Sequence, residues 1–123
     1  MTFGILLISP GHERAHYAFM LACGAAAMGR NVVLFATNEG CRALCRDWSG
    51  MADAGRDAKV RSRGVAGLEE LRSAAAELAV GLMVCDSGLR MAGIETAALL
   101  GGVEVAGVPT FLSAVGAGQA LTL

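Results

Sequence analysis

Cys85 is the residue whose type and position most clearly suggest chemistry. It follows the apolar run 82–84, which predicts a buried strand, and it precedes Asp86 and Ser87, where a helix is expected to begin. The free N–H groups and the positive dipole end at the start of a helix favour a thiolate. Arg90, one helical turn later, would add positive potential, whereas Asp86 would work against the thiolate if its carboxylate pointed inward. The pattern predicts a nucleophilic thiol, and a small, packed core cysteine is the alternative.

The other cysteines fit a core role better. Cys41 and Cys45 share one helical face with Leu44 and Trp48, at positions i, i+4, i+3 and i+7. This spacing predicts core packing, with a relay or resolving thiol as the alternative. Cys23 lies in a similar apolar stripe. The cysteines show no CxxC or paired zinc spacing, and they are too few for a disulfide scaffold.

A second motif opens the first predicted helix. His12, Glu13 and His16 match H-E-x-x-H, which on a helix can bring two imidazoles to zinc with the glutamate as base. A zinc protease places this pattern inside a mid-chain helix, and here Phe19 stands where the glycine of an extended form would be. Glu39 is the candidate third ligand of a His12/His16 metal site. We expect instead no metal and no cofactor, with His12 at a solvated helix start or lining the Cys85 pocket.

Composition excludes several classes of protein. The 123 residues suit a single domain, and a net charge of −1 argues against nucleic-acid or anionic-membrane binding. Hydrophobic residues make up 54% and charged residues only 17%, which is below the roughly 25% of ordinary domains. The uncharged stretch 15–29 is too short to span a bilayer, and 105–123 is broken by glycines and Pro109. No secretory signal is visible, so we expect a cytoplasmic chain without a membrane span that buries its apolar surplus in a homo-oligomer.

The elements that must position these residues alternate along the chain. Strands are predicted at residues 3–8, 31–36, 82–85, 103–106 and 119–123. Helices are predicted at 13–28, 68–79, 87–93, 95–100 and 110–116. A further helix is predicted to begin after a cap at Thr37 or Asn38 and to run through residue 48. The charged segment 47–66 is predicted to be a loop or lid.

This alternation predicts an α/β fold with a parallel sheet and helices on both faces. Ligands bind such folds beyond the carboxyl ends of the strands. Residues 9–12, 37–39 and 85–90 all fall at that edge.

Three stretches resemble the DsrE/DsrF/TusD-like sulfur-relay family, especially its small stand-alone members. AFMLACGAAAMGRNVVLFAT at 18–37 is similar to the family's first helix and second strand, and MVCDSGLRMAGI at 83–94 resembles its cysteine motif. VEVAGVPTFLSAVG at 103–116 is similar to the strand and final helix before a closing strand. The resemblance covers nearly the whole chain except 47–66. Asp86 and Ser87 stand where many members carry small apolar residues.

The resemblance implies a three-layer α/β/α domain over 1–123, with a mostly parallel sheet of about five strands. It also implies a sulfur carrier or sulfurtransferase that holds sulfane sulfur as a persulfide on Cys85, between donor and acceptor proteins. The homo-oligomer would be a trimer or hexamer, and a dimer is the alternative. The alternative is a non-catalytic oligomeric module that binds a small ligand or partner at the strand-end edge. The residues expected to support Cys85 are Asp86, Ser87, Arg90, His12 and Asn38.

Overall fold

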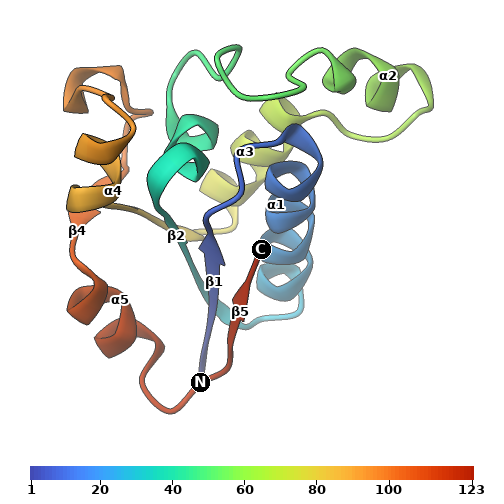
Figure 1. Ribbon diagram of the computed structural model, residues 1–123. Helices are drawn as coiled ribbons and strands as arrows, with labels where there is room; N and C mark the ends of the chain where they lie inside the picture. The colour runs from blue at the N-terminus through green and yellow to red at the C-terminus, as the bar shows by residue number, and fades with distance from the viewer.

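Five parallel strands form the centre of the molecule (Figure 1). The computed structural model describes residues 1–123. The strands are β1 (Thr2–Leu7), β2 (Asn31–Ala36), β3 (Gly81–Cys85), β4 (Glu104–Ala106) and β5 (Ala120–Thr122). They lie in the order β4-β3-β2-β1-β5, and every neighbouring pair is parallel. The predicted α/β fold with a five-stranded parallel sheet is confirmed.

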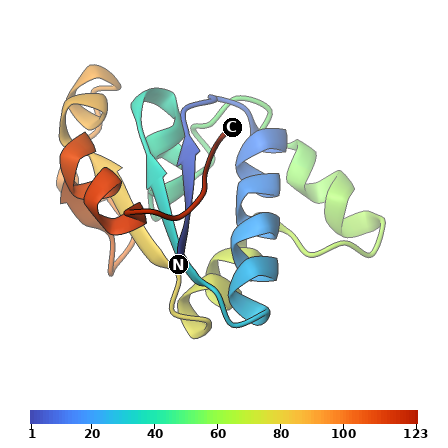
Figure 2. The same cartoon turned by 90° about the horizontal axis from the view of Figure 1, so that it is seen from below.

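Helices cover both faces of this sheet and make three layers. They are α1 (His12–Ala27), α2 (Arg56–Ser62), α3 (Leu68–Glu77), α4 (Asp86–Met91) and α5 (Val108–Val115), with the 3₁₀ helices η1 (Asn38–Leu44) and η2 (Thr96–Ala98). In Figure 2, α1 lies on one side of the sheet and α5 on the other. Parallel crossovers are right-handed, so the connections from β1 through β3 put α1 and α3 on one face. The connection from β4 to β5 then crosses the sheet from one edge back to the other, opposite to the earlier connections, and this puts α5 on the other face.

The two faces have unequal cores. The larger cluster joins α1 and α3 to the inward residues of the strands, including Ile5, Leu34 and Val84. The smaller cluster lies under α5, where the rings of Phe35 and Phe111 stack with centroids 4.9 Å apart. Cys85 belongs to this smaller cluster, so α5 covers the sheet face onto which the Cys85 side chain projects.

The second helix differs from its prediction. We expected one apolar helix carrying residues 41–48, but η1 is a 3₁₀ helix that ends at Leu44. Cys45 instead forms an antiparallel bridge with Leu99. The guanidinium of Arg72 donates to the carbonyls of Ala43, Cys45 and Arg46 and thereby satisfies the end of η1. A contact between distant segments therefore decided where this helix ends.

The charged segment 47–66 is not only a loop. It contains α2, which projects beyond the N-terminal end of α1 (Figure 1). Backbone hydrogen bonds hold the segment at its start, because His12 N donates to Ala52 O at 2.9 Å and Ala52 N donates to Pro10 O at 3.1 Å. We call residues 47–66 the lid below.

The uncharged stretch 105–123 divides into short elements, as its glycines and proline predict. It contains the end of β4, the eight-residue α5 with a proline in its first turn, and β5. Among the helices of the structure, none combines the length and the apolar character that crossing a membrane requires.

Candidate functional site

Cys85 lies where β3 passes into α4. It is the last residue of the strand and the N-cap of the helix, with extended backbone angles of φ −71° and ψ 124°. The register pairs Ala36 with Val84, so Thr37 lies beside Cys85 at the carboxyl ends of β2 and β3. The thiol therefore occupies the strand-end edge that the sequence predicted.

Neutral polar groups, and no charged group, lower the pKa of the Cys85 thiol. The Ser87 hydroxyl oxygen lies 3.3 Å from Cys85 Sγ. Burial raises the pKa of Cys85, but the Ser87 hydroxyl and the nearby donor groups of Gly88 N–H, Thr37 hydroxyl and Ser87 N–H outweigh this effect. The pKa of Cys85 is lowered from its ordinary 9.0. The residue is only 5% exposed, so these donors act in a site with little water.

Gly88 allows these donors to converge. A Cβ at this position would lie 2.2 Å from Thr37 Oγ1 and 2.5 Å from the backbone nitrogen of Asn38. Any residue with a Cβ would push the first turn of α4 away from the end of β2. The glycine thus brings Ser87 and Thr37 to one sulfur.

Asp86 and Arg90 lie at the surface and face each other. Arg90 Nη2 donates to Asp86 Oδ2 at 2.9 Å, and the two side chains are 75% and 58% exposed. The guanidinium charge expected to support Cys85 is therefore paired with the carboxylate expected to oppose it. Neither is among the causes that lower the pKa of Cys85.

The backbone of Asn38 lies against Gly88, and Glu39 follows it in η1. Asn38 has a left-handed backbone with φ 51° and, with Glu39, Met91 and Ala92, lines a hollow of about 180 Å³. Glu39 accepts a hydrogen bond from Arg42 Nε at 2.8 Å. The structure brings Asn38 next to the Cys85 turn through Gly88, and Glu39 faces Arg42 rather than a histidine.

The remaining cysteines lie within the larger core or against it. Cys41 is fully buried, and its thiol donates to the carbonyl of Ala36 at 3.6 Å. Burial, together with the nearby Cys85 and Cys45 thiols, raises the pKa of Cys41 to about 12. Burial also raises the pKa of Cys45 and of Cys23. Of the four thiols, only Cys85 has a lowered pKa.

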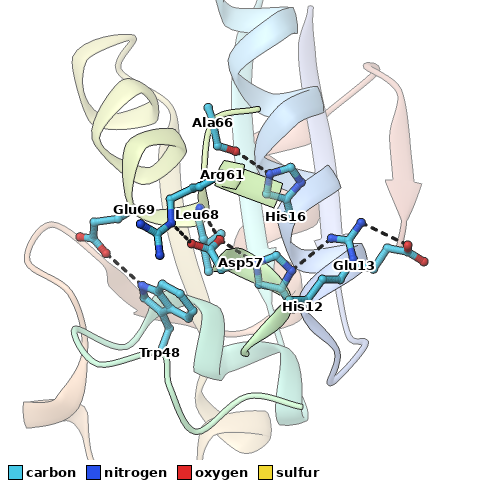
Figure 3. Close-up of polar contacts among 10 residues, drawn as sticks. His12, Glu13, His16, Trp48, Asp57, Arg61, Ala66, Leu68 and Glu69 are labelled. Carbon is cyan, nitrogen blue, oxygen red and sulfur yellow. Dashed lines mark hydrogen bonds and ion pairs between the residues drawn. The ribbon is translucent and has the colours of Figure 1, made fainter. Parts of the chain in front are cut away.

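His12 makes its contacts with the lid (Figure 3). Arg56 Nη1 donates to His12 Nδ1 at 3.2 Å, so Nε2 carries the proton and donates to Asp57 Oδ1 at 2.8 Å. His12 is fully buried, and Trp48 packs near its ring. The structure thus joins His12 to residues of the lid, whereas the polar groups near Cys85 come from Thr37, directly after β2, and from the first turn of α4.

Asp57 is the centre of this buried cluster. Its Oδ1 also accepts the N–H of Leu68 at 2.8 Å, and its Oδ2 accepts Arg61 Nε at 3.2 Å. Burial raises the pKa of Asp57, but the Leu68 N–H, the His12 hydrogen bond and the charge of Arg61 together lower it below 3.8. The carboxylate joins the start of α1, the helix α2 and the start of α3.

His16 also holds the lid in place. Its Nε2 donates to the carbonyl of Ala66 at 2.8 Å, and its ring stacks on His12 with centroids 5.5 Å apart. The structure contains no group of three histidine, cysteine, aspartate or glutamate side chains that could hold a metal ion. His12, Glu13 and His16 contact residues of the lid instead. Glu39 pairs with Arg42 and does not join the two histidines in a ligand set.

Sequence reasoning missed the roles of three residues in this arrangement. Thr37 was expected as a helix cap at the strand-end edge and not as a donor near the thiol, and Gly88 was given no part in holding the thiol. The signal for Thr37 is the strand register, which a sequence does not display. Asp57 was likewise hidden among the charged residues of the lid, although a carboxylate that pairs with a buried histidine has a different role from its exposed neighbours.

Comparison with known proteins places the chain in a family. The model of the DsrE/DsrF-like family matches residues 1–122. The fold is similar to the crystal structure of the YchN protein from E. coli, with a TM-score of 0.75 and 16% identity, covering 100% of this chain and 99% of that one. It is also similar to MTH1491 from Methanobacterium thermoautotrophicum, a protein of unknown function, with a TM-score of 0.65 and 16% identity, covering 99% and 98%. No curated protein sequence matches the chain.

The two structural similarities, at 16% identity, concern the fold alone. The family match rests on the sequence itself and covers every element from β1 to β5. The chain belongs to the DsrE/DsrF-like family.

Proposed function

We propose that this protein is a sulfur carrier or sulfurtransferase that holds sulfane sulfur as a persulfide on Cys85. The observation that carries the proposal is the set of donors from Ser87, Gly88 and Thr37 around a thiol of lowered pKa. A thiolate is the form that attacks sulfur, and a persulfide anion on the same residue would accept the same hydrogen bonds. Membership of a family connected with sulfur relay supports the same reading.

The transfer needs no external oxidant or reductant. The Cys85 thiolate attacks the outer sulfur of a donor persulfide, R–S–SH, and a new S–S bond forms as the old one breaks. The donor leaves as a thiolate that takes up a proton, and Cys85 becomes Cys85–S–SH. A thiolate of the acceptor protein then attacks the outer sulfur, and Cys85 leaves as a thiolate that the Ser87, Gly88 and Thr37 donors stabilise.

The surface above Cys85 suits protein partners. Phe111 and Val115 of α5 pack in the same cluster as Cys85, while Val108 and Leu112 of that helix are 50% and 57% exposed. Met91, at the end of α4, is 80% exposed. We propose that donor and acceptor proteins contact this apolar surface, and that the protein acts in the cytoplasm as a homo-oligomer, a trimer or hexamer or else a dimer.

Intact-mass spectrometry after incubation with a sulfane-sulfur donor tests the central proposal. We expect one added sulfur atom per chain, lost on treatment with a reductant, and absent from the Cys85→Ser variant. Cys41→Ser is the matched control, because Cys41 is buried with a pKa of about 12, and it should keep the adduct. An adduct that persists in Cys85→Ser, or none in the native chain, would reject the assignment.

A second candidate is a non-catalytic module that binds a small ligand or partner at the strand-end edge. The observation in its favour is that Cys85 is only 5% exposed and packs with Phe35, Phe111 and Val115. This candidate expects slow reaction of Cys85 with a small thiol reagent in the folded protein. Fast labelling at that single cysteine favours the sulfur carrier.

A further inference from the structure

We propose that two copies of this chain associate by antiparallel pairing of their β5 strands, which joins their sheets into one. This deepens the homo-oligomer of the proposed function by naming an interface. It does not depend on the chemistry of Cys85, because β5 and β3 lie on opposite sides of β1 in the strand order.

One edge of β5 carries free backbone groups. On the β1 side, Gly4 N donates to Gln119 O at 2.8 Å and Leu123 N donates to Leu6 O at 2.8 Å. Hydrogen-bonding direction alternates along a strand, so Ala120 and Thr122 turn their N–H and C=O groups away from β1. All three residues of β5 are exposed, so no other element covers this row of donors and acceptors.

This edge carries no side chain that opposes pairing. Proteins guard exposed edge strands by keeping them short and with charges, prolines or bulges. β5 is only three residues long, but it has no charge, proline or bulge, and residues 105–123 contain no charged side chain. The opposite edge strand, β4, begins with Glu104. The contrast singles out β5 as the edge available to another strand.

An apolar groove runs beside the free edge. It has a volume of about 470 Å³ and lies between β5 and the outer face of α1. Leu121 is 38% exposed, Met20 is 37% exposed and Tyr17 is 56% exposed. The residues lining it are Phe3, Tyr17, Met20, Leu21, Gly24, Ala25, Met28, Arg30, Gln119 and Leu121.

A second copy satisfies the edge and the groove together. A two-fold axis at Leu121 pairs Ala120 with the partner's Thr122, and these residues exchange both backbone hydrogen bonds. Leu121 then faces the partner's Leu121 as a non-hydrogen-bonded pair, the closer type of cross-strand contact. Their side chains lie between the two grooves, where apolar surface of each copy covers the other.

A charge placed at the two-fold axis tests the β5–β5 interface, and the readout is the molecular mass of the protein in solution. We expect Leu121→Lys to lower the mass measured by light scattering, halving it where the pair is the whole assembly, because two like charges would meet at the axis. Val105→Lys is the matched control: Val105 is 39% exposed, but it lies on the opposite edge strand. A native chain that stays at 12.5 kDa, or a Leu121→Lys chain with unchanged mass, would overturn the proposal.

Cross-linking provides a second readout that does not depend on weakening the fold. In a Cys85→Ser background, we expect Leu121→Cys to form a disulfide-linked dimer when treated with diamide, and Val105→Cys to stay monomeric on a non-reducing gel. Equal cross-linking of both variants would overturn the proposal. Leu121→Lys should still form the Cys85 persulfide, so failure of this interface and failure of sulfur transfer are distinguishable.

Discussion

The Cys85 thiol differs from the other thiols of the chain through dipoles rather than through a charge. Arg90, the nearest cation predicted from the sequence, is paired with Asp86 at the surface. The sulfur instead contacts the Ser87 hydroxyl, and the dipoles of the Thr37 hydroxyl and of the Ser87 and Gly88 N–H groups add to the lowering of its pKa. A hydrogen bond to an ionised group contributes about 1.5–3 kcal/mol, more than a bond between neutral groups. Neutral donors also lower the pKa without attracting a competing anion to the site.

Replacing Ser87 tests this account. We expect Ser87→Ala to raise the pKa of Cys85, because it removes the foremost of the hydrogen bonds that lower it. The fraction of Cys85 present as thiolate at neutral pH would decrease. Labelling of Cys85 by iodoacetamide would become several-fold slower, and the pH midpoint of the labelling rate would move upward. Labelling rates followed across pH measure both effects.

Arg90→Ala is the control for that experiment. Its guanidinium is 75% exposed and paired with Asp86, so we expect the pH midpoint of labelling to stay close to that of the native protein. A larger shift in Arg90→Ala than in Ser87→Ala would show that charge, and not the hydroxyl donor, controls the thiol.

From the sequence, Cys85 and Ser87 could be proposed as candidate site residues, but the contributions of Thr37 and Gly88 could not. A cysteine between an apolar run and a helix start is visible in one segment of the chain. The contribution of Thr37 depends on the β2–β3 register, and that of Gly88 depends on a gap too narrow for a Cβ. Both are relations between segments that lie far apart in the sequence.

At the scale of elements, the lid is held by the residues that resemble a zinc motif. His12 and His16 project from the first turns of α1 and hydrogen bond to Asp57 and to the carbonyl of Ala66. The i, i+4 spacing puts the His12 and His16 rings on one face of α1. Two rings on one face can hold a neighbouring segment as well as bind a metal. The motif alone could not separate these uses, because the decisive partner, Asp57, lies in a segment predicted only as a loop.

Removing Asp57 should loosen the lid. Asp57→Ala leaves the Nε2–H of His12 and the buried N–H of Leu68 without their acceptor. We expect the free energy of unfolding to fall by about 2–5 kcal/mol, as for other buried pairs that lose one partner. Urea denaturation measures the loss, and limited proteolysis should show faster cleavage within residues 47–66.

Glu70→Ala is the matched control, because Glu70 is an exposed carboxylate in the first turn of α3. We expect its stability to change by less than about 0.5 kcal/mol, the usual range for surface substitutions. Equal losses in the two variants would contradict a special role for Asp57.

At the scale of the whole molecule, Asp57 makes stability depend on pH. Its pKa is lower in the folded chain than the ordinary 3.8, so the ionised form stabilises the fold above that pH. The contribution disappears as the pH falls through the lower, folded pKa. In urea denaturation at a series of pH values, the stability difference between native and Asp57→Asn chains should stay constant above 3.8 and shrink below it. A difference that widens in acid would contradict this.

The alternation of strands and helices was enough to predict the layers, but not the order of the strands. β5 could add at either edge of the sheet, and only the path of α5 decides between them. That path crosses β1 at Gly4, where a Cβ would lie 2.4 Å from Val115 Cγ2. A glycine inside an apolar strand is consistent with such close packing, but it does not identify the helix that packs there.

The strand order also has a consequence for synthesis of the chain. β1 is made before β5, its neighbour in the sheet, and every other strand and helix of residues 1–123 lies between the two in the sequence. While the ribosome adds everything between them, Gly4 and Leu6 lack the partners that Gln119 and Leu123 later supply. The nascent chain therefore exposes an apolar strand edge until β5 emerges, and this is the period in which chaperone binding would protect it from aggregation.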